Sequence, residues 1–372
     1  MPSVTNNSAT ITPAPTPVTV ARTYRFVVGV DTHAATHSYA VLDSAGALLD
    51  EQTFPTTTTT GIGRAREWIG RRTGGDLDGV LIAAEGTGSY GAVLAEALAE
   101  VGYRVVEAPT PRRDRGRGKT DAMDAVTAAR NTLTMRLDRL RDRRGGQDQV
   151  VLQVLTTARE QLNAERLRAL NALTSLARSH DLGIDARRAL TGPQVRQIAA
   201  WRRRNEPLGT ATARAEAVRL AGRVVQLDDE LKSNREQLTA IVADRTPQLL
   251  GMPGVGAITA AVVLCVWSHP GRVRSEDAMA QIAGTCPIPA SSGNTVRHRL
   301  NRGGDRRLNW ALNTIVLTRM RDDAETRDYV TRRTAEGKTR REIRRCLKRY
   351  TTRQIYRMLN AAHPLEEPGR AA

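Results

Sequence analysis

The chain has 372 residues, enough for two or three domains, and a formal net charge of +17. Residues 1–130 hold 13 basic and 14 acidic side chains, so the positive excess lies in the other two thirds and favours a polyanionic partner such as nucleic acid. Three isolated cysteines exclude a disulfide framework and a zinc-finger pattern and favour a reduced, cytoplasmic setting, and no apolar run reaches membrane-spanning length.

The amino-terminal region predicts a disordered tail followed by an α/β domain. Residues 1–22 are rich in Thr, Pro and Ser and lack the apolar core of a signal peptide. The expected strands cover residues 24–31, 38–43, 47–54, 79–85 and 103–108, with helices near 62–72 and 90–101. Three antiparallel strands followed by helix, strand, helix and strand are the order of a ribonuclease H-like fold, in which the first and fourth strands are parallel neighbours.

Four acidic residues stand where such a fold would gather them. Asp31 and Glu85 end the first and fourth strands, and Asp121 and Asp124 share one face at the start of the next helix. Clustered carboxylates repel one another unless cations neutralise them, so the pattern predicts two Mg²⁺ ions about 3.5–4 Å apart that assist phosphoryl transfer. The alternative is four unrelated acids at strand ends and a helix start, where Asp is common.

A basic loop precedes the aspartate pair. Its Gly118-Lys119-Thr120 resembles the end of a phosphate-binding P-loop, but a P-loop also needs Gly five residues before Gly118, and that residue is Arg113. The loop predicts contact with a nucleic-acid backbone, and a solvated linker is the alternative. Its candidate binding residues are Arg112, Arg113, Arg115, Arg117 and Lys119.

The middle of the chain is helical. A long amphipathic helix is expected from Val150 to Asp181, and residues 217–241 carry apolar side chains in alternating steps of three and four with one polar core residue, Asn234. This heptad pattern favours coiled-coil self-association, and a helical hairpin within one chain is the alternative.

The last third is basic and mainly helical. Residues 249–261 resemble a helix-hairpin-helix motif, whose glycine turn would present backbone N–H groups to DNA phosphates, unless it is only a turn between packed helices. The small-residue loop 284–293 contains Ser291 and Ser292, and a serine hydroxyl faced by arginines could attack a phosphodiester. The arginines that follow the loop are Arg297, Arg299, Arg302, Arg306 and Arg307. Residues 332–357 predict arginine-covered helices that contact nucleic acid.

Taken together, these motifs resemble the insertion-sequence 110 family of DEDD-type transposases, also described as bridge-RNA-guided serine recombinases. The resemblance implies a RuvC-like domain at 23–135 with Mg²⁺ on the four acids, a helical coiled-coil oligomerisation region at 136–246, and a mainly α transposase domain at 247–360. Residues 361–372 would be a second tail. The family serine precedes Gly, which selects Ser292 and leaves its neighbour Ser291 as an open alternative.

The resemblance also implies an activity and partners. The chain would cut and rejoin donor and target DNA through a covalent phosphoserine link, guided by a noncoding bridge RNA. It would act as a homo-oligomer, a dimer that forms a tetramer in the synaptic complex, in the bacterial cytoplasm and at the nucleoid. Two other interpretations remain: a RuvC-like metal-dependent nuclease or junction resolvase that uses water, and a nucleic-acid-binding protein with a degenerate acidic site.

Overall fold

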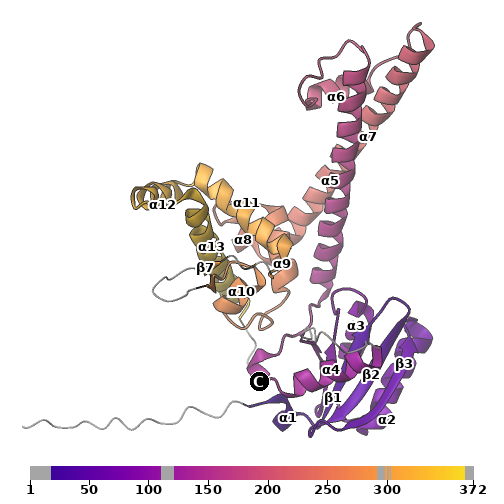
Figure 1. The fold of residues 1–372 in the computed structure, drawn as a ribbon, viewed down its shortest axis with the longest axis vertical. Coiled ribbons are helices and arrows are strands. Elements are labelled where there is room, and N and C mark those ends of the chain that lie inside the picture. Colours follow the sequence, from indigo (N-terminus) through magenta and orange to yellow (C-terminus); the bar gives the residue numbers. More distant parts are fainter. Residues whose placement is uncertain (1–17, 110–120, 291–297, 300, 302, 365–372) are drawn as a thin grey trace, which may run out of the picture. The chain divides into compact units, whose positions relative to one another are not determined.

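The computed structural model describes residues 18–109, 121–290, 298–299, 301 and 303–364. The chain divides into two compact units between Arg144 and Gly145 (Figure 1). Within the described ranges, none of the helices combines the length and the apolar character needed to cross a bilayer.

The first unit is built on a mixed five-stranded sheet. Its strands are β1 (Phe26–Thr32), β2 (Thr36–Asp43), β3 (Leu48–Pro55), β4 (Val80–Ala84) and β5 (Arg104–Glu107). The order across the sheet is β3-β2-β1-β4-β5. The first three strands form an antiparallel meander, whereas β4 runs parallel to both β1 and β5. The expectation that the first and fourth strands are parallel neighbours is therefore confirmed.

Helices cover both faces of this sheet. They are α1 (Val20–Thr23), α2 (Gly63–Thr73), α3 (Ala92–Glu100) and α4 (Asp121–Leu133), with a π-helical turn at Thr58–Ile62 and a 3₁₀ turn at Leu137–Arg139. On one face, Val28 of β1 shares a core with residues of α2 and α3. On the opposite face, Val27 shares a core with residues of α4, because successive strand residues point to opposite sides.

The second unit is almost entirely helical. Its helices are α5 (Gln147–Ser179), α6 (Gly192–Ala199), α7 (Leu208–Arg245), α8 (Pro247–Leu250), α9 (Ala257–Trp267), α10 (Glu276–Ile282), α11 (Arg306–Asp322), α12 (Ala324–Ala335) and α13 (Arg340–Ala362). A two-residue ladder pairs β6 (Ile288–Pro289) with β7 (His298–Arg299). The largest core of this unit joins the start of α5 and the end of α7 to α8, α9, α11 and α13.

The heptad face of α7 packs on α5 of the same chain (Figure 1). Asn234 is buried; its Nδ2 donates to Leu155 O at 3.0 Å, and its Oδ1 accepts from Arg159 Nη1 at 3.3 Å. The structure thus shows the intramolecular hairpin that the sequence left open as the alternative. Since the apolar face of α7 already has a partner, the heptad pattern gives no support to self-association, which stays a prediction.

The glycine turn between α8 and α9 packs against α11. Gly254 has φ +73°, and a Cβ there would lie 2.8 Å from Ile315 O. The buried side chain of Arg319 donates from Nε to Pro253 O at 2.7 Å. These contacts account for the small residues of the turn as packing between helices, and its contact with DNA phosphates stays a prediction.

Candidate active site

Two of the four predicted acids lie at the same edge of the sheet. Asp31 is the penultimate residue of β1, with 5% of its surface exposed, and Glu85 follows directly after β4. Their predecessors, Val30 and Ala84, are paired in register, and the Glu85 N–H donates to Val30 O at 3.0 Å. The parallel pairing therefore places both acids at neighbouring strand ends, as the sequence predicted.

A glycine allows α4 to approach β1 closely at this point. Gly29 lies two residues before Asp31 and shares its face of the strand. A Cβ on Gly29 would lie 2.0 Å from Ala125 O and 2.8 Å from Ala129 N, so there is room only for hydrogen. The backbone of α4 consequently lies directly on β1, on the face that carries Asp31.

The aspartate pair is carried by this same helix. Asp124 is half-buried and directly precedes Ala125, which is fully buried against the sheet. Asp121 is the first residue of α4, one turn before Ala125, but its side chain lies outside the described residues. Residues four apart share a helix face, so Asp124 lies on the side of α4 that carries the buried Ala128.

Two neighbours of Asp31 were missed by the sequence argument. His33 Nε2 lies 3.0 Å from Asp31 Oδ2, and the two atoms share a hydrogen bond. Thr32 Oγ1 donates to Glu85 O at 3.0 Å and so joins the end of β1 to the loop that carries the second acid. Apart from their position beside Asp31 in the chain, no pattern in the sequence identifies them.

The donor chemistry fits a hard divalent cation. Carboxylate oxygens are the ligands that Mg²⁺ prefers, and Asp31, Glu85 and Asp124 supply them near the end of β1, just after β4 and in the first turn of α4. Within the described ranges, no three Asp, Glu, His or Cys side chains form a group that would hold a metal ion, and the side chain of Asp121 lies outside those ranges. The fit therefore rests on the donor types and on the adjoining elements that carry them.

The nearby buried histidine does not supply the missing positive charge. His37 of β2 is 2% exposed, and burial lowers its pKa below the ordinary value near 6.5 by disfavouring the imidazolium form. A hydrogen bond with the Thr36 backbone and the Asp31 charge oppose this shift more weakly. The neutral form of His37 is therefore favoured, and this side chain adds little positive charge beside Asp31.

The segment between Gly284 and Gly304 contains Ser291 and Ser292 and is called the serine loop below. At its two ends, Gly284 and Gly304 pack tightly against each other. A Cβ on Gly304 would lie 2.4 Å from Gly284 N and 2.8 Å from Ile282 O. Asn309 Nδ2 donates to Ala283 O at 2.7 Å, and Lys348 Nζ donates to Asn309 Oδ1 at 2.6 Å. These contacts bring the two ends of the loop together, whereas Ser291 and Ser292 lie outside the described residues.

Gly304→Ala is expected to separate the two ends of the loop. The added methyl group meets backbone atoms, which cannot rotate away, so we expect a cost of about 1–3 kcal/mol and a fall of two orders of magnitude or more in DNA strand transfer. Gly303→Ala is the matched control, since its Cβ would meet only Asn301 Oδ1 at 3.5 Å. Urea unfolding and a strand-transfer assay measure both effects, and equal activity in the two variants contradicts the prediction.

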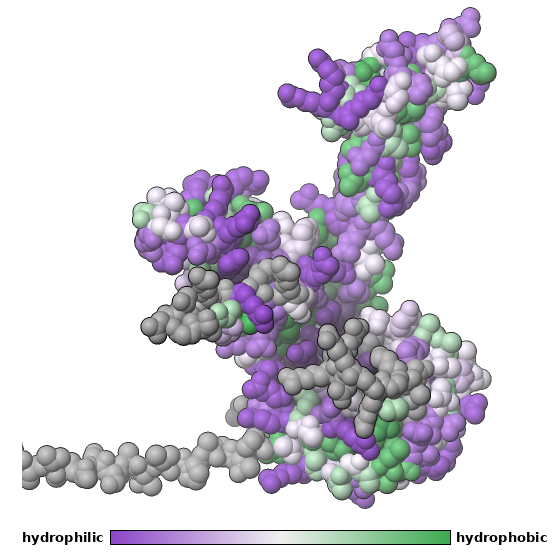
Figure 2. All heavy atoms as spheres, viewed as in Figure 1, coloured by the Kyte–Doolittle hydropathy of each residue, from purple (hydrophilic) through white to green (hydrophobic). Residues whose placement is uncertain are grey.

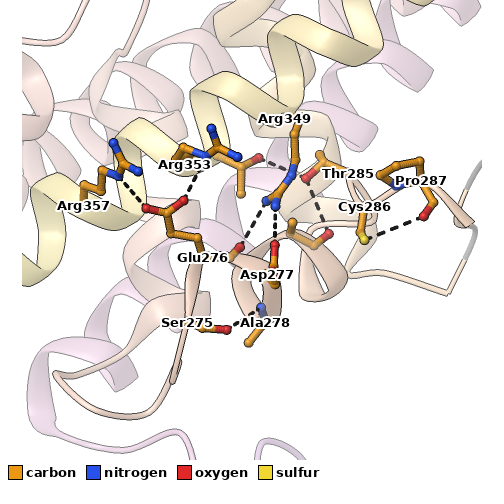
Figure 3. Close-up of polar contacts among 12 residues, drawn as sticks. Ser275, Glu276, Asp277, Ala278, Thr285, Cys286, Pro287, Arg349, Arg353 and Arg357 are labelled. Atoms are coloured by element: carbon orange, nitrogen blue, oxygen red, sulfur yellow. Dashed lines mark hydrogen bonds and ion pairs between the residues drawn. The ribbon is translucent and has the colours of Figure 1, made fainter. Parts of the chain in front are cut away.

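The arginines of α13 fall into two sets. Glu276, at the start of α10, forms ion pairs with Arg353, at 2.8 Å, and with Arg357, while Arg349 pairs with Asp277 (Figure 3). These three arginines are four residues apart and join α13 to α10. The first turns of α13 carry the second set, which forms no ion pair with any described acid: Arg340, Arg341, Arg344 and Arg345. Only the second set remains available for phosphates.

Glu276→Gln is expected to lower the free energy of unfolding by about 1 kcal/mol. The change removes two partly exposed ion pairs and a carboxylate from the first turn of α10, each worth a fraction of this amount. Glu325→Gln is the matched control, because Glu325 lies in the first turn of α12 and has no ion pair with the described residues. Urea unfolding that shows the same loss in both variants would assign the effect to the helix dipole alone.

The other predicted nucleic-acid ligands are only partly described. Arg112, Arg113, Arg115, Arg117, Lys119, Arg297 and Arg302 lie outside the described residues. Arg299 is exposed on β7, and Arg306 is exposed in the first turn of α11. Arg307 instead pairs with Glu160 of α5, its Nε lying 2.6 Å from Oε1, so it joins α11 to α5. The structure thus assigns a packing role to Arg307, which the sequence predicted only as a ligand.

Comparison with known proteins finds transposase families in both units. Residues 28–180 match the DEDD model of the IS110 elements, described as a transposase, and residues 247–331 match the model described as transposase IS116/IS110/IS902 family. A 42 kDa protein of insertion element IS900 from Mycobacterium paratuberculosis is 30% identical over 294 residues, 66% of this chain and 72% of that protein. A 44.8 kDa protein of IS116 from Streptomyces clavuligerus is 26% identical over 363 residues, 84% and 89% of the two chains.

These matches cover the acids at the sheet edge and the two glycines that pack together at the ends of the serine loop. The chain belongs to the IS116/IS110/IS902 family of transposases and is thereby a DNA-processing enzyme with a DEDD domain.

Proposed function

We propose that this transposase recombines DNA through a RuvC-like, ribonuclease H-like metal site and a nucleophilic serine, Ser292. The observation that carries the proposal is the geometry at one edge of the sheet. Asp31 and Glu85 follow paired residues of parallel strands, and Gly29 lets the helix with Asp121 and Asp124 lie directly on β1. Carboxylates carried on adjoining elements repel one another unless a cation neutralises them, so this arrangement supports the proposed binding site for divalent metal.

Asp31, Glu85, Asp121 and Asp124 would hold Mg²⁺, two ions in the full proposal. When bound, the metal would neutralise phosphate oxygens and polarise the phosphodiester. Asp31 is oriented by its hydrogen bond with His33, and Thr32 fixes the backbone of Glu85. The chain's own contribution is a set of carboxylate acceptors at fixed backbone positions, of which Asp31 is buried and Glu85 and Asp124 are half-buried.

Ser292 would carry the covalent step. Its Oγ attacks the phosphorus of a DNA phosphodiester, the new Oγ–P bond replaces a P–O bond to deoxyribose, and the serine proton is transferred to the leaving oxygen. The phosphoserine keeps the energy of the broken bond, so a DNA hydroxyl can later displace the serine and reseal the strand. The arginines near the loop would stabilise the negative charge on the phosphoryl oxygens. Arg299 and Arg306 are the described candidates that remain exposed.

The proposal includes partners and an assembly. DNA would bind as donor and target, a noncoding bridge RNA would select both by base pairing, and the acidic site of one protomer would act with the serine of another in a dimer or tetramer. The functional regions would be the catalytic domain at 23–135, the helical region at 136–246 and the transposase domain at 247–360. The protein would work in the cytoplasm, at the nucleoid.

The test is the formation of a covalent DNA adduct. The purified full chain is incubated with Mg²⁺, its co-purifying RNA and end-labelled DNA from the ends of its element, then denatured and separated by size. We expect label on the wild-type protein and none on Ser292→Ala. Ser291→Ala is the matched control, since the neighbouring serine tests whether loss of any hydroxyl in this loop has the same effect.

Each outcome assigns a different chemistry. An adduct lost only in Ser292→Ala supports the proposal, and one lost only in Ser291→Ala moves the nucleophile by one residue. Cleaved DNA without an adduct in any variant overturns the serine step and favours a metal-dependent nuclease or resolvase that uses water. Strand transfer that persists in EDTA, or in Asp121→Asn, overturns the metal site.

A further inference from the structure

The far end of the α5–α7 pair is a separately packed tip. Residues from the end of α5, from α6 and from the start of α7 form a core distinct from the one at the other end of the pair. This core includes side chains from two loops, residues 180–191 and 200–207, and so anchors both loops to the helices. Arg178 holds the first loop by donating from Nε to Ala186 O at 2.7 Å.

The second loop is held by one buried arginine. Arg214 of α7 is 6% exposed, donates to both carboxylate oxygens of Glu206 at 2.7 Å, and stacks with its guanidinium 4.7 Å from the centre of the Trp201 ring. A bidentate pair and a cation–π contact from the same side chain order residues 201–206. The intervening arginines, Arg202, Arg203 and Arg204, are therefore presented on an ordered loop and are exposed.

The tip concentrates positive charge. Residues 178–214 contain eight arginines and three acids. Two of the acids are already engaged, Asp185 by Arg187 and Glu206 by Arg214. Five arginines of the tip are exposed and form no ion pair with the described residues: Arg188, Arg196, Arg202, Arg203 and Arg204. On the face drawn in Figure 2, hydrophilic residues predominate at this end of the pair, with apolar residues among them.

We propose that this tip binds the phosphate backbone of duplex DNA, at a contact separate from the catalytic residues. Arginines on ordered loops displace counterions from phosphates without reading bases. The only Phe, Tyr or Trp in residues 178–214 is Trp201, whose ring is already stacked on Arg214, so the tip offers no platform for unpaired bases and favours a duplex. The inference rests on the DNA substrate of the proposed function and not on its metal or serine chemistry.

The length of α5 sets the distance between the tip and the core at the other end of the pair. Leu173, in the tip core, and Leu152, in the core at the other end, are 21 residues apart on α5. At 1.5 Å per residue this is about 32 Å, close to one turn of B-DNA at about 34 Å. A duplex that contacts the arginines of the tip and also those of α10–α13 would thus have to be about one helical turn longer than a duplex bound by α10–α13 alone.

The experiment measures binding alone. Full-length protein is titrated with a fluorescent 40-base-pair DNA duplex in EDTA at several salt concentrations, so cleavage does not enter the readout. For Arg202→Gln/Arg203→Gln/Arg204→Gln, we expect at least a tenfold loss of affinity and a salt slope smaller by about two to three. The matched control, Arg168→Gln/Lys232→Gln/Arg235→Gln, removes the same charge from exposed positions between the two ends and should lose less than threefold.

Each possible binding result either supports or contradicts DNA binding by the tip. Equal losses in the two triple variants, or no loss in the tip variant, overturn it, as does a loss seen with an RNA duplex but not with DNA. Arg188→Gln/Arg196→Gln, in the first loop and in α6, must also weaken binding, which keeps the test valid if the first variant misfolds. Binding is measured in EDTA and involves neither the serine nor the metal, so a negative result in the adduct experiment does not alter the expected affinities. The two proposals can therefore be contradicted separately.

Discussion

Gly29→Ala should destabilise the amino-terminal unit and abolish strand transfer. The new methyl carbon would lie 2.0 Å from Ala125 O, which is backbone in the middle of α4 and cannot move without the helix. Relief requires α4 to lift from β1, which separates Asp121 and Asp124 from Asp31. We expect the free energy of unfolding to fall by about 3 kcal/mol or more, at the upper end of the cost of overpacking a core.

The matched control for this change is Gly70→Ala in the same unit. Gly70 lies inside α2 and a Cβ there meets nothing within 4 Å, so alanine should raise stability by up to about 1 kcal/mol through its better helix propensity. Chemical unfolding followed by tryptophan fluorescence compares the two variants. Equal stability of Gly29→Ala and the wild type would mean that α4 does not lie on β1 as described.

Asp31→Asn should leave the fold intact and reduce strand transfer by about three orders of magnitude, or roughly 4 kcal/mol of transition-state stabilisation. The side chain is buried near the end of β1, on the strand face that packs on α4. The neutral amide keeps the volume, keeps an acceptor for His33 and relieves repulsion, so we expect unchanged or slightly higher stability. Only the charge that would hold a cation is lost.

Glu107→Gln is the matched control, because Glu107 ends β5, the third parallel strand at the same edge. It has the strand parity of Val105, which packs with α2 and α3, and it accepts from Thr87 Oγ1 at 3.5 Å. Strand transfer and the binding of Mn²⁺, followed by its paramagnetic resonance signal, measure both variants. Full activity in Asp31→Asn contradicts the acidic site, and a comparable loss in Glu107→Gln extends it to the third strand.

The sheet and two of its acids could be predicted from the chain alone. Short apolar runs that end at Asp31 and Glu85, separated by turns and one helix, are local signals, and few strand orders accommodate them. The helix that starts at Asp121 was equally visible from its composition. The close approach of that helix at Gly29 was not, because one glycine in an apolar strand carries no sign of what lies opposite it.

Partner choice was decided by the tertiary structure. The heptads of residues 217–241 showed correctly which face of α7 is buried, yet they could not show that α5 of the same chain covers it. The arginines of α13 looked alike in sequence, but Glu276 and Asp277 engage only those in its second half. Arg214 and Arg307 likewise proved to have packing roles.

One physical reason separates what the sequence determines from what only the tertiary structure decides. Periodicity and composition report whether a side chain avoids water, which depends on its own chemistry and its neighbours along the chain. The identity of the group that covers it, or of the acid that neutralises it, depends on contacts between residues distant in sequence. The sequence by itself therefore determined the elements, the strand-end acids and the basic character of this transposase, and only the packed chain decided which arginines support the fold and which remain exposed for DNA.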